Sequence, residues 1–304
     1  MTRSAPPDRT DRIAVTSTFV TVRDGLRIHA RCYEPPQAGG IPVVCLSGLA
    51  RTAEDFTELA LALAGDSVRP RTVVAIDYRG RGRSDYDSDP ANYALPVELA
   101  DLVEVIASLR CEPAIFVGTS RGGILTMLMA ASHPAVLAGA VLNDIGPVIE
   151  LEGLLRIKGY VGRLPPPRDY TEAATLLRHM GATQFPNLSD ADWLRQARRT
   201  WAMRDGALAL AYDPRLAETL AAIVPDQPLS ALWDAFDALA PIPLMVIRGA
   251  KSDILSSDTV ASMQALRPDL DYLEVADQGH APLLVEPDEI KRIAAFAAHC
   301  DARR

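Results

Sequence analysis

Long apolar runs are missing from this sequence. The longest stretches, such as Ile124–Ala131, are far shorter than the roughly 20 residues that span a bilayer. The N-terminal segment Met1–Arg12 is polar, and no apolar core of a signal peptide follows it. We therefore expect a soluble, cytoplasmic protein that does not interact with a membrane.

Cysteine is also scarce. The four cysteines, Cys32, Cys45, Cys111 and Cys300, are widely spaced and form neither a metal-ligand nor a disulfide pattern. Cys32 and Cys45 lie in apolar, strand-like runs, so buried free thiols are expected there. The sequence therefore implies no metal site.

Basic residues are fewer than acidic residues. Lysine and arginine total 31 against 39 aspartates and glutamates, which gives a formal net charge of −8. An acidic chain without a clustered basic patch argues against nucleic acid and anionic membranes as partners. A small-molecule substrate is the partner that we expect, and the sequence leaves the oligomeric state open.

The pattern of apolar residues predicts an α/β fold. Alternation around Asp24-Gly25, in Thr18–Arg23 and Arg27–Tyr33, predicts an antiparallel hairpin. Further strands are predicted at Pro42–Leu46, Thr72–Ile76, Ala114–Val117, Ala140–Leu142, Leu244–Arg248 and Tyr272–Val275. Helices are predicted at Glu54–Ala64, Val97–Leu109, Ile124–Ser132, Ser257–Leu266 and Glu289–His299. Strands that alternate with helices indicate a mostly parallel, doubly wound sheet.

The alternation breaks after Asp144. From Gly146 to about Leu239 the sequence is predicted to be mostly helical, and the small apolar run Ala207–Ala211 is interpreted as helix-forming. We therefore divide the chain into a core, residues 1–145 and 241–304 with a loose arm at 1–14, and a helical cap, residues 146–240.

Residues 114–123 carry the clearest chemical signal. An apolar strand stops at Gly118, Ser120 follows, and a helical stretch begins near Gly122. This is the G-x-S-x-G pattern of a nucleophile elbow, in which a strained turn exposes the serine oxygen. The glycines lack a Cβ, so that strand and helix can approach closely. Ser120 is the candidate nucleophile, and it needs a base to take its proton.

Several motifs in order resemble the α/β-hydrolase superfamily with a cap inserted after the sixth strand. They are Leu46-Ser47-Gly48-Leu49 after a strand, the glycine-rich loop Asp77–Ser84, the elbow, Gly249–Asp253 after a strand, and Gly279-His280-Ala281-Pro282 after the last strand. The resemblance covers about residues 18–299 and implies the α/β-hydrolase fold, with a sheet of about eight strands. It also implies that no cofactor is needed.

The resemblance assigns the other site residues. Of the five histidines, His280 is the implied base. Asp253 is the favoured acid, in the chain order Ser120, Asp253, His280. Some members take the acid from the position after the sixth strand, which makes Asp144 the alternative.

The backbone N–H groups of Leu49 and Arg121 are the implied oxyanion hole. Ser47 stands where members usually have histidine, which leaves open how this loop is held. The loop with Arg79, Arg81 and Arg83 has an architectural role in the superfamily. Phosphate binding is an alternative, but the loop lacks the P-loop lysine and spacing, and the arginines are expected to pair with carboxylates or solvent.

A serine nucleophile favours carbonyl chemistry over attack on an alkyl carbon. The predicted activity is hydrolysis of a small, largely apolar carboxylic ester or lactone, as in a serine esterase. Alternatives are carbon–carbon bond hydrolysis of a β-diketone-like substrate, an acyltransferase, or a ligand receptor on this fold. Trp193, Trp201 and Tyr160 are candidate pocket residues, although for each tryptophan, Trp233 included, a place in the core of the insert is favoured.

Overall fold

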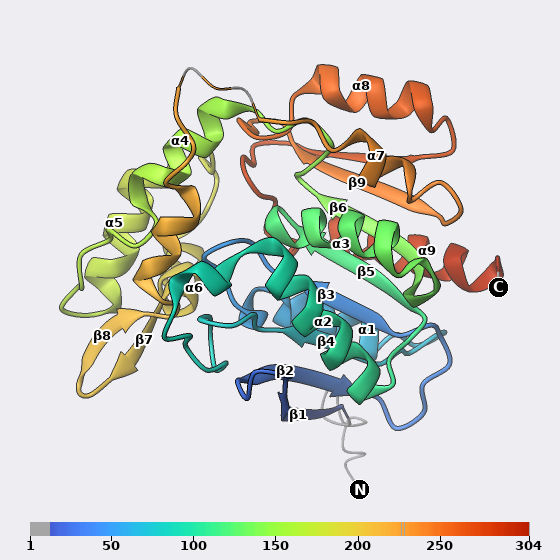
Figure 1. The fold of residues 1–304 in the computed structure, drawn as a ribbon, viewed down its shortest axis with the longest axis horizontal. Coiled ribbons are helices and arrows are strands. Elements are labelled where there is room, and N and C mark those ends of the chain that lie inside the picture. The colour runs from blue at the N-terminus through green and yellow to red at the C-terminus, as the bar shows by residue number, and fades with distance from the viewer. Residues whose placement is uncertain (1–12, 226, 228, 304) are drawn as a thin grey trace, which may run out of the picture.

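The computed structural model describes residues 13–225, 227 and 229–303, so most of the predicted N-terminal arm lies outside the described residues. Its centre is an eight-stranded sheet in the order β1-β2-β4-β3-β5-β6-β9-β10 (Figure 1). The strands are β1 Ala14–Thr21, β2 Arg27–Glu34, β3 Val43–Leu46, β4 Val73–Ile76, β5 Ala114–Thr119, β6 Leu137–Asn143, β9 Leu244–Gly249 and β10 Asp271–Val275.

The sheet is mixed but mostly parallel. The β1–β2 hairpin and the β2–β4 pair are antiparallel, and every other pair in this sheet is parallel. The four residues of β3 and of β4 are all buried, as expected for central parallel strands that are covered on both faces. The predicted mostly parallel sheet of about eight strands is confirmed.

Helices cover both faces of the sheet. Val74 belongs to a core that includes Leu102, Leu125 and Met263, whereas its neighbour Val73 belongs to a second core. This alternation follows from the two-residue period of a strand. The first face carries α2 Leu95–Leu109, α3 Arg121–Ser132, α7 Trp233–Asp237 and α8 Ser257–Leu266, and the second carries α1 Thr57–Ala64 and α9 Pro287–Ala302. Short 3-10 helices are η2 Ala53–Phe56, η3 Pro90–Tyr93, η4 Pro134–Val136 and η5 Pro214–Leu220.

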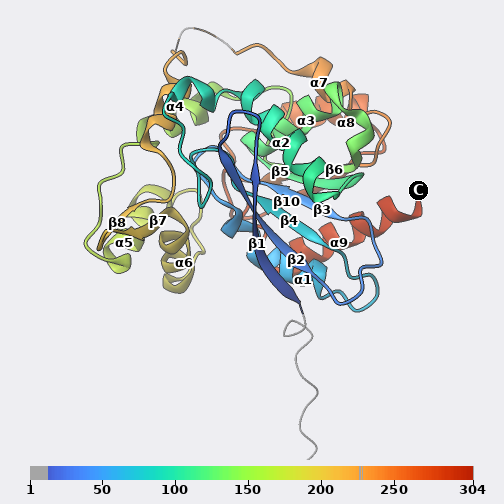
Figure 2. The same cartoon turned by 60° about the horizontal axis from the view of Figure 1, so that its bottom comes forward.

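The segment after β6 forms a separate group of elements to one side of the sheet (Figures 1 and 2). It contains α4 Leu151–Tyr160, α5 Tyr170–Gly181, α6 Asp190–Thr200, β7 Trp201–Arg204 and β8 Ala207–Leu210. A capping box between Ser189 and Asp192 fixes the start of α6. We call these elements, α4 to β8, the cap. Helix α7 packs instead against α3, and its Trp233 lies on the first core.

The prediction that Ala207–Ala211 is helical is wrong. Residues Ala207–Leu210 form β8, which pairs with β7 in an antiparallel hairpin. The two turn residues, Asp205 and Gly206, have φ of 49° and 83°. Two positive φ values in a two-residue loop are typical of the turn that suits a hairpin, and Asp-Gly is a favoured sequence for it.

No helix of the described residues combines the length and the apolar character that crossing a bilayer requires.

Candidate active site

Ser120 sits in a strained turn between β5 and α3. Its φ is 52° and its ψ is −114°, a left-handed conformation that is costly for a residue with a side chain. Its N–H donates to the carbonyl of Asn143 at 3.0 Å, which holds the turn. A Cβ on Gly118 would lie 2.5 Å from the carbonyl oxygen of Gly122, and one on Gly122 would lie 2.1 Å from that of Leu46. The two glycines therefore permit the close approach that the elbow needs.

His280 and Asp144 complete a hydrogen-bonded line with Ser120. Nε2 of His280 lies 2.8 Å from Oγ of Ser120, and Nδ1 lies 2.8 Å from Oδ2 of Asp144. A carboxylate at Nδ1 fixes the tautomer in which Nε2 is free to accept the serine proton. The structure thus brings Ser120 and His280 together, as the sequence predicts, and it supplies the carboxylate from Asp144.

Asp253 does not pair with His280, so the favoured prediction for the acid is corrected. Its carboxylate binds Arg156 of the cap, with contacts of 2.5 Å to Nε and 2.9 Å to Nη2. Burial opposes ionisation of Asp253, but hydrogen bonds from Arg156 and Gln184 and the charge of His280 outweigh it and hold its pKa below the ordinary value. Asp253 is therefore engaged as the counter-ion of an arginine.

The Gly249–Asp253 loop supports the acid rather than supplying it. Gly249 N–H donates to Oδ1 of Asp144 at 2.7 Å, and the Ser252 hydroxyl donates to Oδ2 at 2.6 Å. Asp144 is fully buried and has φ 57°, a conformation that aspartate tolerates better than most residues. With Nδ1 of His280, three hydrogen-bond donors thus surround the Asp144 carboxylate. Burying a carboxylate without such partners would cost much free energy.

Asn143 is a site residue that the sequence analysis missed. Its side-chain amide donates to Oγ1 of Thr119 at 3.0 Å and to the carbonyl of Pro282 at 2.9 Å. It thereby links the elbow strand to the loop that carries His280. Asn143 is fully buried at the end of β6, and no sequence motif marks it.

The predicted oxyanion donors flank the serine. Leu49 belongs to the same cavity wall as Ser120, and a Cβ placed on the adjacent Gly48 would lie 3.7 Å from Cβ of Ser120. Among the described residues, the backbone N–H groups of Leu49 and Arg121 have no hydrogen-bond acceptor. Two free donors beside the nucleophile can bind a developing oxyanion.

Ser47 helps to hold the oxyanion loop in place of the usual histidine. Its hydroxyl donates to the carbonyl of Arg51 at 3.2 Å, and its own carbonyl accepts from the hydroxyl of Tyr78 at 3.2 Å. Nε of Arg81 donates to the carbonyl of Leu49 at 2.9 Å. The loop is therefore fixed by its own side chain and by the glycine-rich loop Asp77–Ser84.

Glu98, a residue of α2, connects the two residues of the predicted oxyanion hole through its two carboxylate oxygens. One oxygen accepts from Nη1 of Arg81 at 2.6 Å, and the other accepts from Nε of Arg121 at 2.6 Å. Arg81 in turn holds the carbonyl of Leu49. Glu98 is fully buried, and no sequence motif marks it.

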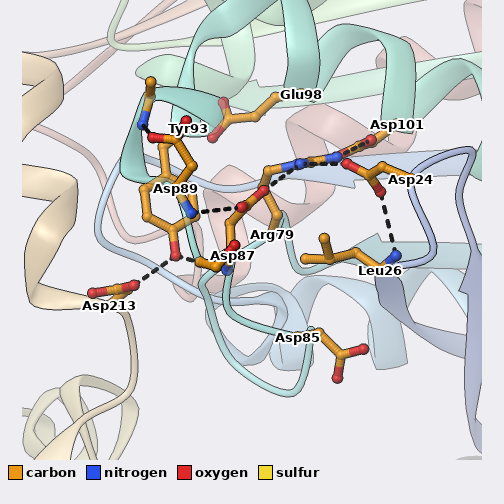
Figure 3. A network of polar contacts seen from close by, with 12 residues as sticks. Asp24, Leu26, Arg79, Asp85, Asp87, Asp89, Tyr93, Glu98, Asp101 and Asp213 are labelled. Atoms are coloured by element: carbon orange, nitrogen blue, oxygen red, sulfur yellow. Dashed lines mark hydrogen bonds and ion pairs between the residues drawn. The ribbon is translucent and has the colours of Figure 1, made fainter.

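Arg79 of the glycine-rich loop is also committed to the fold, whereas Arg83 is exposed and donates to the Ser17 hydroxyl. Figure 3 shows fully buried Arg79 between Asp24, Asp87 and Asp101, with contacts of 2.6–2.9 Å. Because the Arg79 and Arg81 guanidiniums are buried and bound to carboxylates, neither is available to a phosphate. The same figure shows the Tyr93 hydroxyl at Asp213, a contact that ties η3 to the segment after the cap hairpin.

A family model described as "Alpha/beta hydrolase family" matches residues 43–293, which include the elbow, Asp144 and His280. The chain belongs to the alpha/beta hydrolase family.

Two relatives of this alpha/beta hydrolase are named as hydrolases of different substrates. The chain is 34% identical to a 3-hydroxybutyrate-oligomer hydrolase of Cupriavidus necator, over 82% of this chain and 85% of that protein. It is 28% identical to a 2-(acetamidomethylene)succinate hydrolase of Mesorhizobium japonicum, over 74% and 78%. A crystal structure of an alpha/beta hydrolase from Novosphingobium aromaticivorans is 42% identical and superposes with a TM-score of 0.86, over 93% and 98%.

A cavity of about 450 Å³ lies between the Ser120–His280 pair of this hydrolase and the cap. Tyr160 and Trp193 line it, as predicted, with other cap residues such as Leu164 and Phe185. Trp201 does not line it, so that prediction is corrected. Trp201 is fully buried in a small core with Ala173, Ala197 and Leu208, because the cap needs apolar volume of its own.

A second Ser-His-Asp arrangement lies outside the cavity. His29 Nδ1 is 2.7 Å from Oδ2 of Asp77, and Nε2 is 3.0 Å from Oγ of Ser17. Ser17, however, is exposed on the edge strand β1, where no helix start presents a second free N–H group. Asp77 also accepts from the N–H groups of Ala53 and Arg83. These hydrogen bonds anchor the β1–β2 hairpin to the rest of the fold.

Proposed function

We propose that this alpha/beta hydrolase is a serine hydrolase that cleaves a small, largely apolar carboxylic ester through an acyl-enzyme on Ser120. The observation that carries the proposal is the line Ser120–His280–Asp144, with both contacts at 2.8 Å, on the wall of a cavity.

Acylation starts when Nε2 of His280 takes the Ser120 proton. The serine oxygen attacks the ester carbonyl carbon, and the carbonyl π-electron pair moves onto its oxygen. The N–H groups of Leu49 and Arg121 bind this oxyanion, while Asp144 stabilises the protonated imidazole. When the tetrahedral intermediate collapses, the C–O bond breaks and His280 protonates the departing alkoxide.

Deacylation repeats the sequence with water. His280 removes a proton from water, the hydroxide attacks the acyl carbon, and the oxyanion occupies the same two N–H donors. Collapse releases the carboxylic acid, and the proton on His280 returns to Ser120. The step consumes one water and regenerates the enzyme.

Oligoesters of short hydroxy acids are the substrate class that we favour. A relative that shares 34% of aligned residues is named for the 3-hydroxybutyrate oligomer, and the alignment covers most of both chains. The apolar wall, which includes Ile157, Leu177 and Trp193, suits short aliphatic segments between ester groups. A lactone presents the same carbonyl and is the nearest alternative.

The test is a substrate panel with the purified chain. It comprises 3-hydroxybutyrate dimer and trimer, p-nitrophenyl butyrate, a γ-lactone and a β-diketone, with Ser120→Ala as the inactive control. Hydrolysis of the esters by the wild type alone supports the proposal. Cleavage of the β-diketone alone, or equal rates for wild type and Ser120→Ala, contradicts it.

A further inference from the structure

The cavity wall differs in charge from the rest of the protein. The chain carries a net charge of −8, yet the wall holds three arginines, Arg51, Arg156 and Arg199, against one carboxylate, Asp55. The partners of Arg156 and Arg199, Asp253 and Glu58, do not belong to the wall. A ligand in the cavity therefore faces an excess of guanidinium groups.

Arg51 and Arg199 are already used to join the cap to the core. Arg51 donates to both oxygens of Asp55 and reaches Gln196 and Thr200 of α6 at 2.7 and 3.0 Å. Arg199 pairs with Glu58, and its side chain is almost fully buried. Both guanidiniums therefore link the cap to the core, and the Arg199 side chain is only 8% exposed, against 34% for that of Arg156.

Arg156 differs from them. Its Nε and Nη2 bind Asp253, but in the described part of the chain Nη1 donates to no acceptor with hydrogen-bond geometry, and the side chain remains about one-third exposed. Tyr160, one helical turn further along α4, also lines the cavity and lies on the same side of the helix as Arg156. Burial raises the pKa of Tyr160, and the charges of Arg156 and Arg51 act against that rise.

Arg156 and Tyr160 share one cavity with the reacting groups, because Ser120 and His280 line the same wall. Asp253, the partner of Arg156, also follows Ser252, whose hydroxyl binds Asp144. A short substrate with a charged end at Arg156 can therefore present an ester bond to Ser120 within this cavity.

We propose that Nη1 of Arg156 and the hydroxyl of Tyr160 form a subsite for the free terminal carboxylate of an ester substrate. The subsite selects short oligoesters that end in a carboxylate over neutral esters of the same length. This inference rests on the proposed serine hydrolase function, because it names which esters that site prefers.

The test compares two ligands that differ only in charge. The 3-hydroxybutyrate dimer with a free carboxylate is set against the same dimer capped as the primary carboxamide, and kcat/KM is measured for each. Loss of a charge-assisted hydrogen bond is expected to lower the acid-to-amide ratio about 10- to 100-fold in Arg156→Met. Tyr160→Phe is expected to lower it about 2- to 10-fold. Arg163→Met, on an exposed arginine outside the cavity, is the matched control and should leave the ratio unchanged.

Arg156→Met also uncovers the Asp253 carboxylate, which by itself repels an anion. The double variant Arg156→Met, Asp253→Asn removes both charges, and it is expected to keep the low ratio. A double variant that recovers the wild-type preference contradicts the subsite, as does a single variant that loses activity equally on both dimers.

Binding separates the two proposals. Calorimetric titration of Ser120→Ala with the acid and the amide dimer needs no turnover. Tighter binding of the acid that Arg156→Met abolishes supports the subsite, even if the wild type cleaves neither dimer and the hydrolase proposal fails. Turnover with no preference for the acid in either assay overturns the subsite and leaves the hydrolase proposal standing.

Discussion

The buried carboxylate of Glu98 accepts a 2.6 Å hydrogen bond from Nε of Arg121, the residue that follows the nucleophile. Its other oxygen holds Arg81, which in turn holds the carbonyl of Leu49. Glu98 thus positions both Leu49 and Arg121, the residues whose free N–H groups flank Ser120. Since oxyanion stabilisation depends on preorganised donors, Glu98 should affect catalysis without touching the substrate.

Glu98→Gln is expected to lower kcat for p-nitrophenyl butyrate by about 10-fold or more, with a smaller change in KM. The amide keeps one acceptor for Arg81 or Arg121 and loses the other, so one of the two oxyanion residues loosens. Steady-state kinetics at saturating substrate measures the effect.

Asp101→Asn is the matched control for Glu98→Gln. Asp101 is also a buried carboxylate of α2, but it binds Arg79, which contacts neither Leu49 nor the elbow. Both variants should lose stability, because each leaves a buried guanidinium short of an acceptor. A folded Asp101→Asn that loses as much kcat as Glu98→Gln would show that the effect is one of general stability.

Asp144→Asn is expected to lower kcat for a neutral ester by about 10⁴-fold, because the amide can no longer stabilise the protonated His280 in the correct tautomer. Asp253→Asn should change kcat on the same ester less than about 5-fold, because Asp253 pairs with Arg156 instead. Parallel kinetics of the two folded variants checks this, and a larger loss in Asp253→Asn would return the acid to that residue.

The sequence alone did not identify the acid of the triad correctly. Ser120 and His280 could be predicted from the sequence, because each stands in a local motif. Asp144 and Asp253 both follow strands that lie side by side, β6 and β9, so their carboxylates start at the same edge of the sheet. In the structure Asp144 faces His280 and Asp253 binds a cap arginine, Arg156, through a contact that joins residues 97 positions apart.

The elbow glycines make a stability prediction. Gly122→Ala would place a Cβ 2.1 Å from the carbonyl oxygen of Leu46, a backbone atom that cannot turn aside. The free energy of unfolding is expected to fall by about 3 kcal/mol. Gly159→Ala near the end of α4 meets open space and should instead raise stability by ~0.5–1 kcal/mol. Urea unfolding of both variants tests the contrast, and equal effects would refute it.

The fold was more predictable than the cap. Apolar runs such as those in β3 to β6 are local signals, and their alternation with helices determines the doubly wound order. The cap hairpin was missed because alanine and leucine in β8 favour a helix, whereas the Asp205-Gly206 turn and the burial of Trp201 favour strands. Glu98 and Asn143 could not be found from the sequence, because each acts through contacts between distant segments.

The buried carboxylate of Glu289 should make the free energy of unfolding depend on pH. Burial, reinforced by the charge of Glu286, raises its pKa from 4.5 to about 7, although Gln278 of the histidine loop donates to it at 2.8 Å. The folded state therefore binds more protons than the unfolded state between about pH 4.5 and 7. Stability falls as the pH rises through that window, by roughly 3 kcal/mol in total, and stays lower above it.

Glu289→Gln removes this titration and is expected to flatten that part of the pH profile. Its free energy of unfolding, relative to wild type, should rise by up to about 3 kcal/mol between pH 4.5 and pH 8. Asp288→Asn on the same helix, where the carboxylate is exposed, should run parallel to wild type. A Glu289→Gln profile parallel to wild type as well would contradict the raised pKa.

The most direct test of the account is the site of covalent labelling. The chain is incubated with a serine-directed phosphonate, and the adduct is located by peptide mass spectrometry in wild type, Ser120→Ala and Ser17→Ala. One adduct on Ser120, retained in Ser17→Ala and lost together with esterase activity in Ser120→Ala, is the predicted result. No adduct, or an adduct on Ser17 that leaves Ser120 unmodified, would contradict the assignment of the nucleophile and the mechanism built on it.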